Sequence, residues 1–192
     1  MEVTSQMKEI AMLLAKINGE RPQMSRYYDD NRKSIIDLVI MKNKPNEGEK
    51  TYATVGLCNY DIGKIVDGKP LRIEMIGTCI LEEEYFANIL STCAFNIINS
   101  GYQCYPGAIF PDVVKMYYPD IEMKHILFVS PFLWGDNLKT LDFEDKKVTW
   151  LQAIPISEEE YVYAEKYGVE ALEDKLEEAD IDILDLERSS VI

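Results

Sequence analysis

The chain has 192 residues, of which 47% are hydrophobic and 28% charged, and its net charge is −14. This length suits a domain with a proper hydrophobic core, while the strong negative charge argues against direct binding to nucleic acid or to an anionic membrane. No run of 18 apolar residues is present, and the N-terminus lacks the pattern of a signal peptide, so we expect a cytoplasmic protein that does not span a membrane.

The N-terminal third predicts a helix followed by two strands. Apolar residues recur at helical spacing over about residues 5–17, and Gly19 follows as a natural stop. The segments 34–41 and 51–57 are rich in β-branched and aromatic residues and are separated by a polar loop that contains Pro and Gly. We therefore expect them to pair as antiparallel strands.

A third strand and a second helix are predicted next. In the segment 71–80, Arg72 and Glu74 alternate with apolar residues, which indicates a strand with one face in solvent. A wide apolar stripe then predicts a helix from about Glu82 to Asn99. Gly101 is the expected C-terminal stop of this helix.

The second half of the chain predicts a long loop and two buried strands. Residues 102–124 contain several prolines and read as loop, whereas 125–130 and 148–156 are almost continuously apolar, as strands covered on both faces are. Residues 132–137 between them, FLWGDN, predict a loop with an aromatic tip. Because strands and helices intermingle without βαβ regularity, the sequence predicts an α+β fold with a mixed, mainly antiparallel sheet and helices packed on both faces.

The C-terminal segment 157–188 is the most acidic part of the chain. It holds thirteen Asp and Glu residues against three basic ones, which gives a net charge of −10. We found no internal repeat or low-complexity linker that would separate this segment from the rest. We therefore expect a single domain over residues 1–192 that ends in an acidic helical segment, 157–188.

The acidic segment begins with three consecutive glutamates. Ser157 followed by Glu160 has the S-x-x-E spacing of a capping box, and Glu158 and Glu159 lie where the helix dipole favours carboxylates. Gly168 is the expected end of this helix. Consecutive helical residues point about 100° apart, so the three carboxylates cannot converge on one metal ion. Helix capping is the favoured interpretation, and no metal site is expected.

A second helical stretch follows, and its polar face carries the candidate partner-binding residues Glu173, Asp174, Glu177 and Glu178. Like charges four residues apart cost a few tenths of a kcal/mol per pair. One interpretation is an ordinary solvated helix face. The other is a negatively charged surface that attracts a basic protein. The sequence leaves both open.

Catalytic chemistry has weak support. His125 is the only histidine, it begins an apolar strand, and no ligand spacing accompanies it. Cys104 is a conceivable nucleophile with His125 as its base, but one Cys and one His occur together in most chains of this length. The cysteines lie in apolar contexts without metal or disulfide spacing. We expect no catalytic residue and no cofactor, with a Cys/His enzyme as the minor alternative.

The C-terminal part of the chain resembles the signature of suppressor-of-fused-like domains. In that family an apolar strand leads to a Pro-Ile-Ser/Thr step, a helix with Glu at its cap, a Gly, a Leu-rich helix and an Ile-Asp-Val/Leu-x-Asp segment with a late Arg. The matching elements here are Leu151–Ile154, Pro155–Ser157, Glu160, Gly168, Ala171–Leu176, Ile181–Asp185 and Arg188. The segments 52–57, 105–110 and 125–131 also look like elements of that family, so the match extends over most of the chain.

The resemblance implies a protein-binding inhibitor without catalysis. Short bacterial members of the family look like immunity proteins, or antitoxins, that neutralise a co-encoded toxin, here most similar to a partner of an LXG-type toxin with a nuclease domain. In that case the acidic residues would steer the toxin, and an apolar patch would hold it. The candidate anchor is Trp134, with Tyr117, Tyr118 and Phe132 as further candidates, and packing in the core is the equally weighted alternative for each of them. The alternative partner is another basic protein, such as a transcription regulator.

Overall fold

The computed structural model describes residues 3–192. Its strands are β1 (Gln23–Tyr28), β2 (Ile35–Lys42), β3 (Glu49–Val55), β4 (Lys64–Val66), β5 (Lys69–Ile80), β6 (Ile109–Phe110), β7 (Met123–Val129), β8 (Leu141–Asp142) and β9 (Lys147–Ser157). Its α-helices are α1 (Ser5–Asn18), α2 (Phe86–Ser100), α3 (Glu158–Tyr167) and α4 (Val169–Glu178), and two short 3₁₀ segments are η1 (Leu57–Asn59) and η2 (Phe132–Leu138).

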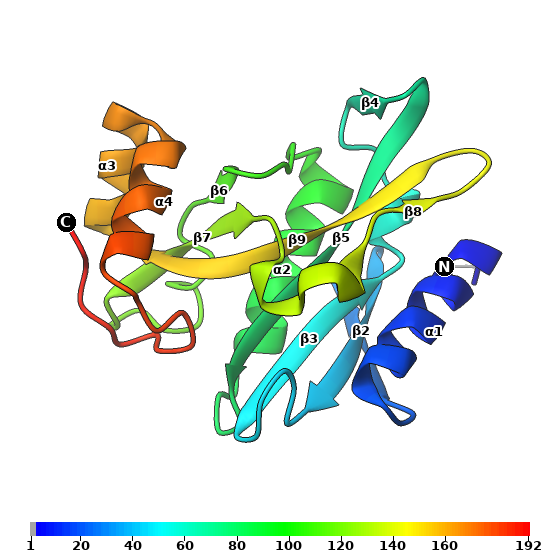
Figure 1. The fold of residues 1–192 in the computed structure, drawn as a ribbon, viewed down its shortest axis with the longest axis horizontal. Helices are drawn as coiled ribbons and strands as arrows, with labels where there is room; N and C mark the ends of the chain where they lie inside the picture. The colour runs from blue at the N-terminus through cyan, green and yellow to red at the C-terminus, as the bar shows by residue number, and fades with distance from the viewer. Residues whose placement is uncertain (1–2) are drawn as a thin grey trace.

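The strands form one nine-stranded sheet with a path in the order β1-β2-β3-β5-β9-β7-β6. Off this path, β4 pairs with β5 and β8 pairs with β9. The central pair, β5 with β9, is parallel, and the other pairs are antiparallel. Figure 1 shows α1 and the α3–α4 pair at opposite ends of the molecule. The predicted α+β fold with a mixed, mainly antiparallel sheet is confirmed.

Helix α1 covers one face of the sheet at β2 and β3. The Thr4 hydroxyl accepts a hydrogen bond from the Met7 N–H (3.2 Å), and Gly19 ends the helix in the left-handed conformation (φ 81°), where glycine has no steric cost. Met7, Ile10 and Leu14 point inward and join the core cluster that also contains Trp134 and Trp150. The predicted helix and its stop are confirmed.

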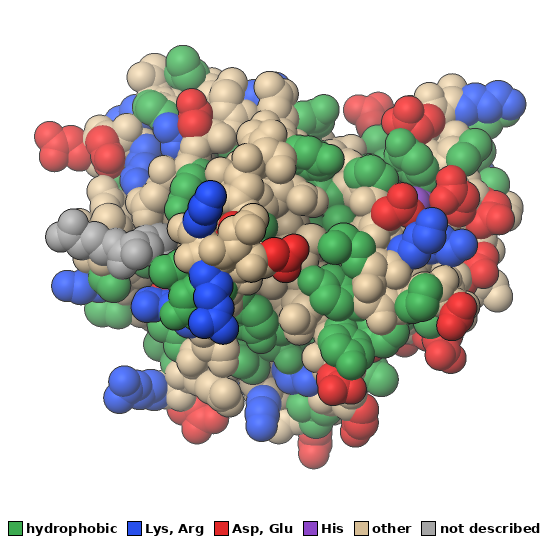
Figure 2. All heavy atoms as spheres, turned by 180° about the vertical axis from the view of Figure 1, so that it is seen from behind, with side chains coloured by type: hydrophobic (Ala, Val, Ile, Leu, Met, Phe, Trp, Pro, Cys, Tyr) green, Lys and Arg blue, Asp and Glu red, His purple; other side chains and the backbone are tan. Residues whose placement is uncertain are grey.

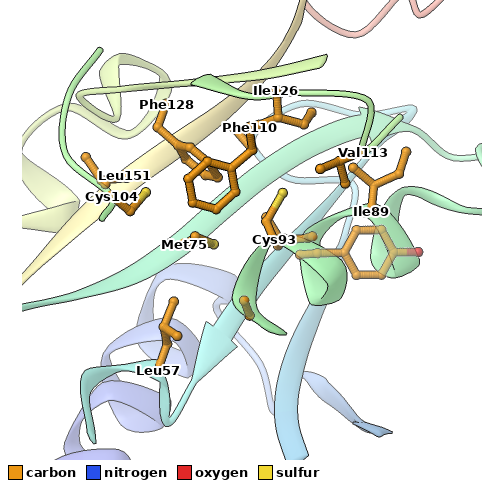
Figure 3. Close-up of a cluster of buried hydrophobic side chains, with 14 of the residues drawn as sticks. Leu57, Met75, Ile89, Cys93, Cys104, Phe110, Val113, Ile126, Phe128 and Leu151 are labelled. Carbon is orange, nitrogen blue, oxygen red and sulfur yellow. The ribbon is translucent and has the colours of Figure 1, made fainter. Parts of the chain in front are cut away.

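Helix α2 covers the other face and contributes to the largest core cluster. Figure 3 shows Cys93 of this helix beside Phe110 and Met75, and Ile89 beside Val113, so the helix packs directly on the sheet. The helix begins at Phe86, four residues later than predicted. The reason is a tertiary contact, because the Lys50 ammonium donates to the carbonyls of Leu81 and Glu83 and holds that segment as a turn.

A glycine in β5 makes the close packing of α2 possible. A Cβ atom at Gly77 would lie 2.5 Å from Cε1 of Phe86, far inside normal contact distance. The Phe86 ring is fully buried in the core cluster at this point. The absence of a side chain at Gly77 therefore sets how closely helix and sheet approach.

The prediction that β5 has a solvated face is wrong. Glu74 is fully buried, because β5 lies in the centre of a sheet that is covered on both faces. Its carboxylate accepts hydrogen bonds from the Thr54 hydroxyl (2.5 Å) and from the N–H groups of Gly56 (2.8 Å), Cys58 (3.2 Å) and Leu57 (3.3 Å). Burial raises the pKa of Glu74 to about 7, although these hydrogen bonds act in the opposite direction.

Four further strands were not predicted from the sequence: β1, β4, β6 and the two-residue β8. β1 and β4 lie on edges or hairpins with mostly exposed residues, so their sequences lack an apolar face. β6 is a two-residue strand inside the predicted loop 102–124. The remaining strands lie within two residues of the predicted ends for 34–41, 51–57, 71–80, 125–130 and 148–156. None of the helices within residues 3–192 combines the length and the apolar character that a membrane crossing needs.

Candidate functional site

The C-terminal unit starts with the predicted capping box. The Glu160 N–H donates to the Ser157 hydroxyl (3.1 Å), and the Ser157 N–H donates to the Glu160 carboxylate (2.9 Å). Two N–H groups at the start of α3 are thereby satisfied. The helix ends at Gly168, as predicted. The structural interpretation of the glutamate triplet is confirmed for the cap itself.

Glu160 also has a second role that the sequence did not reveal. It is fully buried, and it forms a bidentate ion pair with Arg188 (2.6 and 2.8 Å). Arg188 also donates to the Pro155 carbonyl (3.1 Å), and the Val191 N–H donates to Glu160 (3.1 Å). This network fastens the C-terminal end of the chain to the start of α3 and the end of β9.

Helix α4 turns the predicted acidic residues outward. Leu172 and Leu176 are buried in the third core cluster, against β7, β9 and α3. The opposite side of the helix is exposed and is called here the acidic face, which comprises Glu173, Asp174, Glu177 and Glu178. Figure 2 shows acidic side chains gathered on this end of the molecule.

The negative charge of this end is not balanced by its own basic residues. Arg188 is buried against Glu160, Lys175 pairs with Glu178 (2.7 Å), and the Lys166 ammonium lies 4.7 Å from the centre of the Tyr167 ring. Partial burial raises the pKa of Glu173, and the neighbouring carboxylates of Glu170 and Asp174 raise it further. Uncompensated carboxylates on one surface attract cations and repel phosphates.

The predicted aromatic anchors lie in different environments. Trp134 belongs to η2 and is only 5% exposed, in keeping with the alternative interpretation of core packing, whereas Phe132 is 57% exposed. The Tyr117 hydroxyl is hydrogen-bonded to the Thr92 hydroxyl (2.6 Å), and the Tyr118 hydroxyl donates a hydrogen bond to the Glu83 carboxylate. Partner contact by Trp134 stays a prediction that requires η2 to open.

His125 has neighbours that the sequence did not indicate. Its Nδ1 accepts a hydrogen bond from the Asp112 N–H (2.8 Å), and its Nε2 lies 3.2 Å from the Glu158 carboxylate. These partners are 13 and 33 positions away in the chain, so no local spacing could reveal them. The structure therefore brings two acidic residues to His125 that no spacing in the sequence indicated. Burial lowers the pKa of His125, against the opposing effect of Glu158 and Asp112.

The cluster of Asp112, His125 and Glu158 places three potential metal ligands within 4.8 Å of one another. Because Nδ1 accepts the Asp112 N–H, the proton of the neutral ring lies on Nε2 and points at Glu158. A metal ion on Nε2 would move that proton to Nδ1, where it would meet the Asp112 N–H. The hydrogen bonding therefore fits a structural link from the β6–β7 connection to α3 better than a metal site.

Cys104 is not arranged as a nucleophile. Its thiol is fully buried in the core cluster with Phe110 and Leu151, and this burial raises its pKa. Figure 3 shows it among apolar side chains. A reactive cysteine needs a lowered pKa and access to its substrate. Both ring nitrogens of His125 are also occupied, so the Cys104–His125 pair has no geometric support.

Comparison with known proteins gives one consistent result. The family model described as Suppressor of fused protein (SUFU) matches residues 32–189. The chain is 47% identical over 192 residues to the immunity protein YqcF of Bacillus subtilis (strain 168), and the match covers 100% of each chain.

Solved structures show the same fold at low sequence identity. A SUFU homolog from Neisseria gonorrhoeae FA 1090 matches with a TM-score of 0.70 and 19% identity, over 98% of this chain and 98% of that chain. Drosophila Suppressor of Fused matches with a TM-score of 0.63 and 13% identity, over 95% of this chain and 50% of that chain.

Proposed function

This chain belongs to the suppressor of fused protein family, and from that premise we propose that it is an immunity protein that binds and neutralises a cognate protein toxin. The observation that carries the proposal is the 47% identity to the immunity protein YqcF along the full length of both chains. Such a homologue implies a role without catalysis. We further propose that the whole chain, 1–192, acts as a single domain.

The acidic face supports a toxin with a basic surface, such as a nuclease domain of an LXG-type toxin. A nuclease binds a polyanion and needs cationic groups around its active site. The carboxylates of Glu173, Asp174, Glu177 and Glu178 would then take the place of substrate phosphates. Such charge complementarity raises association rates toward roughly 10⁸ M⁻¹s⁻¹ at low salt. Binding of this kind would block the access of nucleic acid to the toxin's active site, and no covalent bond would form or break.

The test is co-expression of this chain with the protein encoded in the adjacent reading frame. We expect the two proteins to co-purify, cells to survive expression of the toxin only when this chain is present, and added chain to suppress nucleic-acid cleavage by the toxin in vitro. The loss of cell protection despite good expression of this chain would contradict the proposal. Binding to a basic protein without any protection would favour the alternative regulatory module.

A further inference from the structure

The solvent face of α3 has an apolar residue at its centre. Val162 is 54% exposed, and Glu158, Glu165 and Lys166 stand three or four residues away, so they flank it on the same helix face. Valine loses rotamer freedom in a helix and contributes nothing to solubility at an exposed position. An exposed valine that is surrounded by charged residues therefore does not stabilise α3.

Two tyrosines lie on one flank of this helix face, since they follow Val162 by one and five positions. The rings of Tyr163 and Tyr167 lie 4.6 Å apart, and Tyr167 is 55% exposed. Lys175 of α4 donates a hydrogen bond to Glu178 of the acidic face (2.7 Å). The acidic face therefore lies on the helix that packs against α3.

The surroundings of this surface indicate the chemistry of its partner. Of the thirteen carboxylates in residues 157–188, Glu160 is the buried one, and the others are exposed. The basic side chains of the segment are engaged with Glu160, Glu178 and the Tyr167 ring. A second copy of this chain would bring the same negative charge and would be repelled. A partner with a basic rim would be attracted.

We propose that Val162, Tyr163 and Tyr167, called here the anchor patch, are the energetic centre of the toxin interface and contact an apolar surface of the toxin that is rimmed by Lys and Arg. The inference rests on the proposed function. Interfaces commonly combine a few buried aromatic or aliphatic anchors with a charged rim, and tyrosine is enriched among the anchors. In this arrangement the anchor patch sets the lifetime of the complex, and the acidic face sets its rate of formation.

The experiment measures binding kinetics to an inactivated form of the toxin domain encoded in the adjacent reading frame. The variants are Val162→Ala, Tyr167→Ala and the double variant, and the matched control is Met12→Ala, a more exposed apolar residue on α1. We expect each anchor variant to dissociate at least about tenfold faster with an association rate within about twofold of wild type. The control should match the wild type in both rates.

The outcomes separate the inference from the proposed function. If wild-type chain binds the toxin and the anchor variants dissociate at the wild-type rate, the anchor patch is wrong while the immunity function stands. If wild-type chain does not bind the toxin, the proposed function itself fails, and the inference fails with it. Sedimentation of the free wild-type chain and of Val162→Lys is a second check, because a dimer that the lysine dissociates would assign this face to self-association and overturn the inference. Circular dichroism ensures that each variant is folded.

Discussion

Arg188 donates two hydrogen bonds of 2.6 and 2.8 Å to the Glu160 carboxylate, and both side chains are buried. The same carboxylate caps α3 at Ser157 and receives the N–H of Val191. One buried group thus ties the beginning of the acidic unit to the end of the chain. The position of both proposed binding surfaces, on α3 and on α4, depends on this attachment.

Loss of Arg188 is expected to destabilise the protein strongly. Arg188→Met leaves the Glu160 carboxylate buried without its counter-ion, which costs about 3–5 kcal/mol of unfolding free energy. Urea unfolding followed by circular dichroism measures this loss. The double variant Arg188→Met/Glu160→Gln removes the buried charge but keeps a capping side chain at position 160. It should therefore lose less unfolding free energy than Arg188→Met does. Lys139→Ala, at an exposed pair with Asp136, is the control and should stay within about 0.5 kcal/mol of wild type. Equal stability of Arg188→Met and wild type would contradict this account.

A side chain at position 77 is expected to conflict with the ring of Phe86. Gly77→Ala places a methyl group where only 2.5 Å separates it from the ring, and such overpacking costs about 1–3 kcal/mol. The variant Gly77→Ala/Phe86→Leu frees space at the contact and should be less destabilised than the sum of the two single variants. Thermal and urea unfolding of the wild type, the two single variants and the double variant gives the coupling free energy between positions 77 and 86. Strict additivity would show that the two residues do not limit each other.

The buried carboxyl of Glu74 predicts a defined pH dependence of stability. Its pKa is raised by burial from 4.5 to about 7, so the folded state binds this proton more tightly than the unfolded state does. The contribution of this carboxyl to the unfolding free energy is therefore fully present below about pH 4.5. It falls by about 3 kcal/mol as the pH rises through 7. The measurement compares the unfolding free energy of wild type and Glu74→Gln from pH 4.5 to 8. Because Gln cannot titrate, the wild type should lose stability relative to this variant as the pH rises. If the difference in unfolding free energy between wild type and Glu74→Gln stays constant across this pH range, the pKa of Glu74 is not raised.

Charge reversal of the acidic face is expected to slow toxin binding. Changing Glu173, Asp174, Glu177 and Glu178 to Lys should reduce the association rate at low salt by at least about tenfold and flatten its dependence on ionic strength. Stopped-flow or surface-based kinetics between about 20 and 500 mM salt measures both effects. The control reverses four exposed carboxylates outside the acidic segment: Glu9, Glu20, Glu47 and Glu144. If both sets slow association equally, net charge and not this face steers the encounter.

Local features of the sequence predicted much of the secondary structure. Gly19 and Gly101 follow their helices directly because a left-handed stop needs only the residue itself, and the Ser157–Glu160 box acts within one helical turn. The resemblance to the suppressor of fused family was confirmed, and the acidic residues of α4 were placed correctly on an exposed face. Local spacing could not reveal the neighbours of His125 or the turn that Lys50 imposes before α2, since these partners come from distant parts of the chain.

The sequence by itself determined the helix ends at Gly19, Gly101 and Gly168, the runs that form the five longest strands and where negative charge accumulates, because these properties depend on residues within a few positions of one another. Only the tertiary structure decided that Glu74 and Trp134 are buried, that β5 and β9 lie parallel at the centre of the sheet, and that Arg188 neutralises Glu160. The physical reason is that burial and ion pairing depend on which segments meet in space. A charged residue in an alternating strand looks the same in sequence whether water or another layer of the protein covers it.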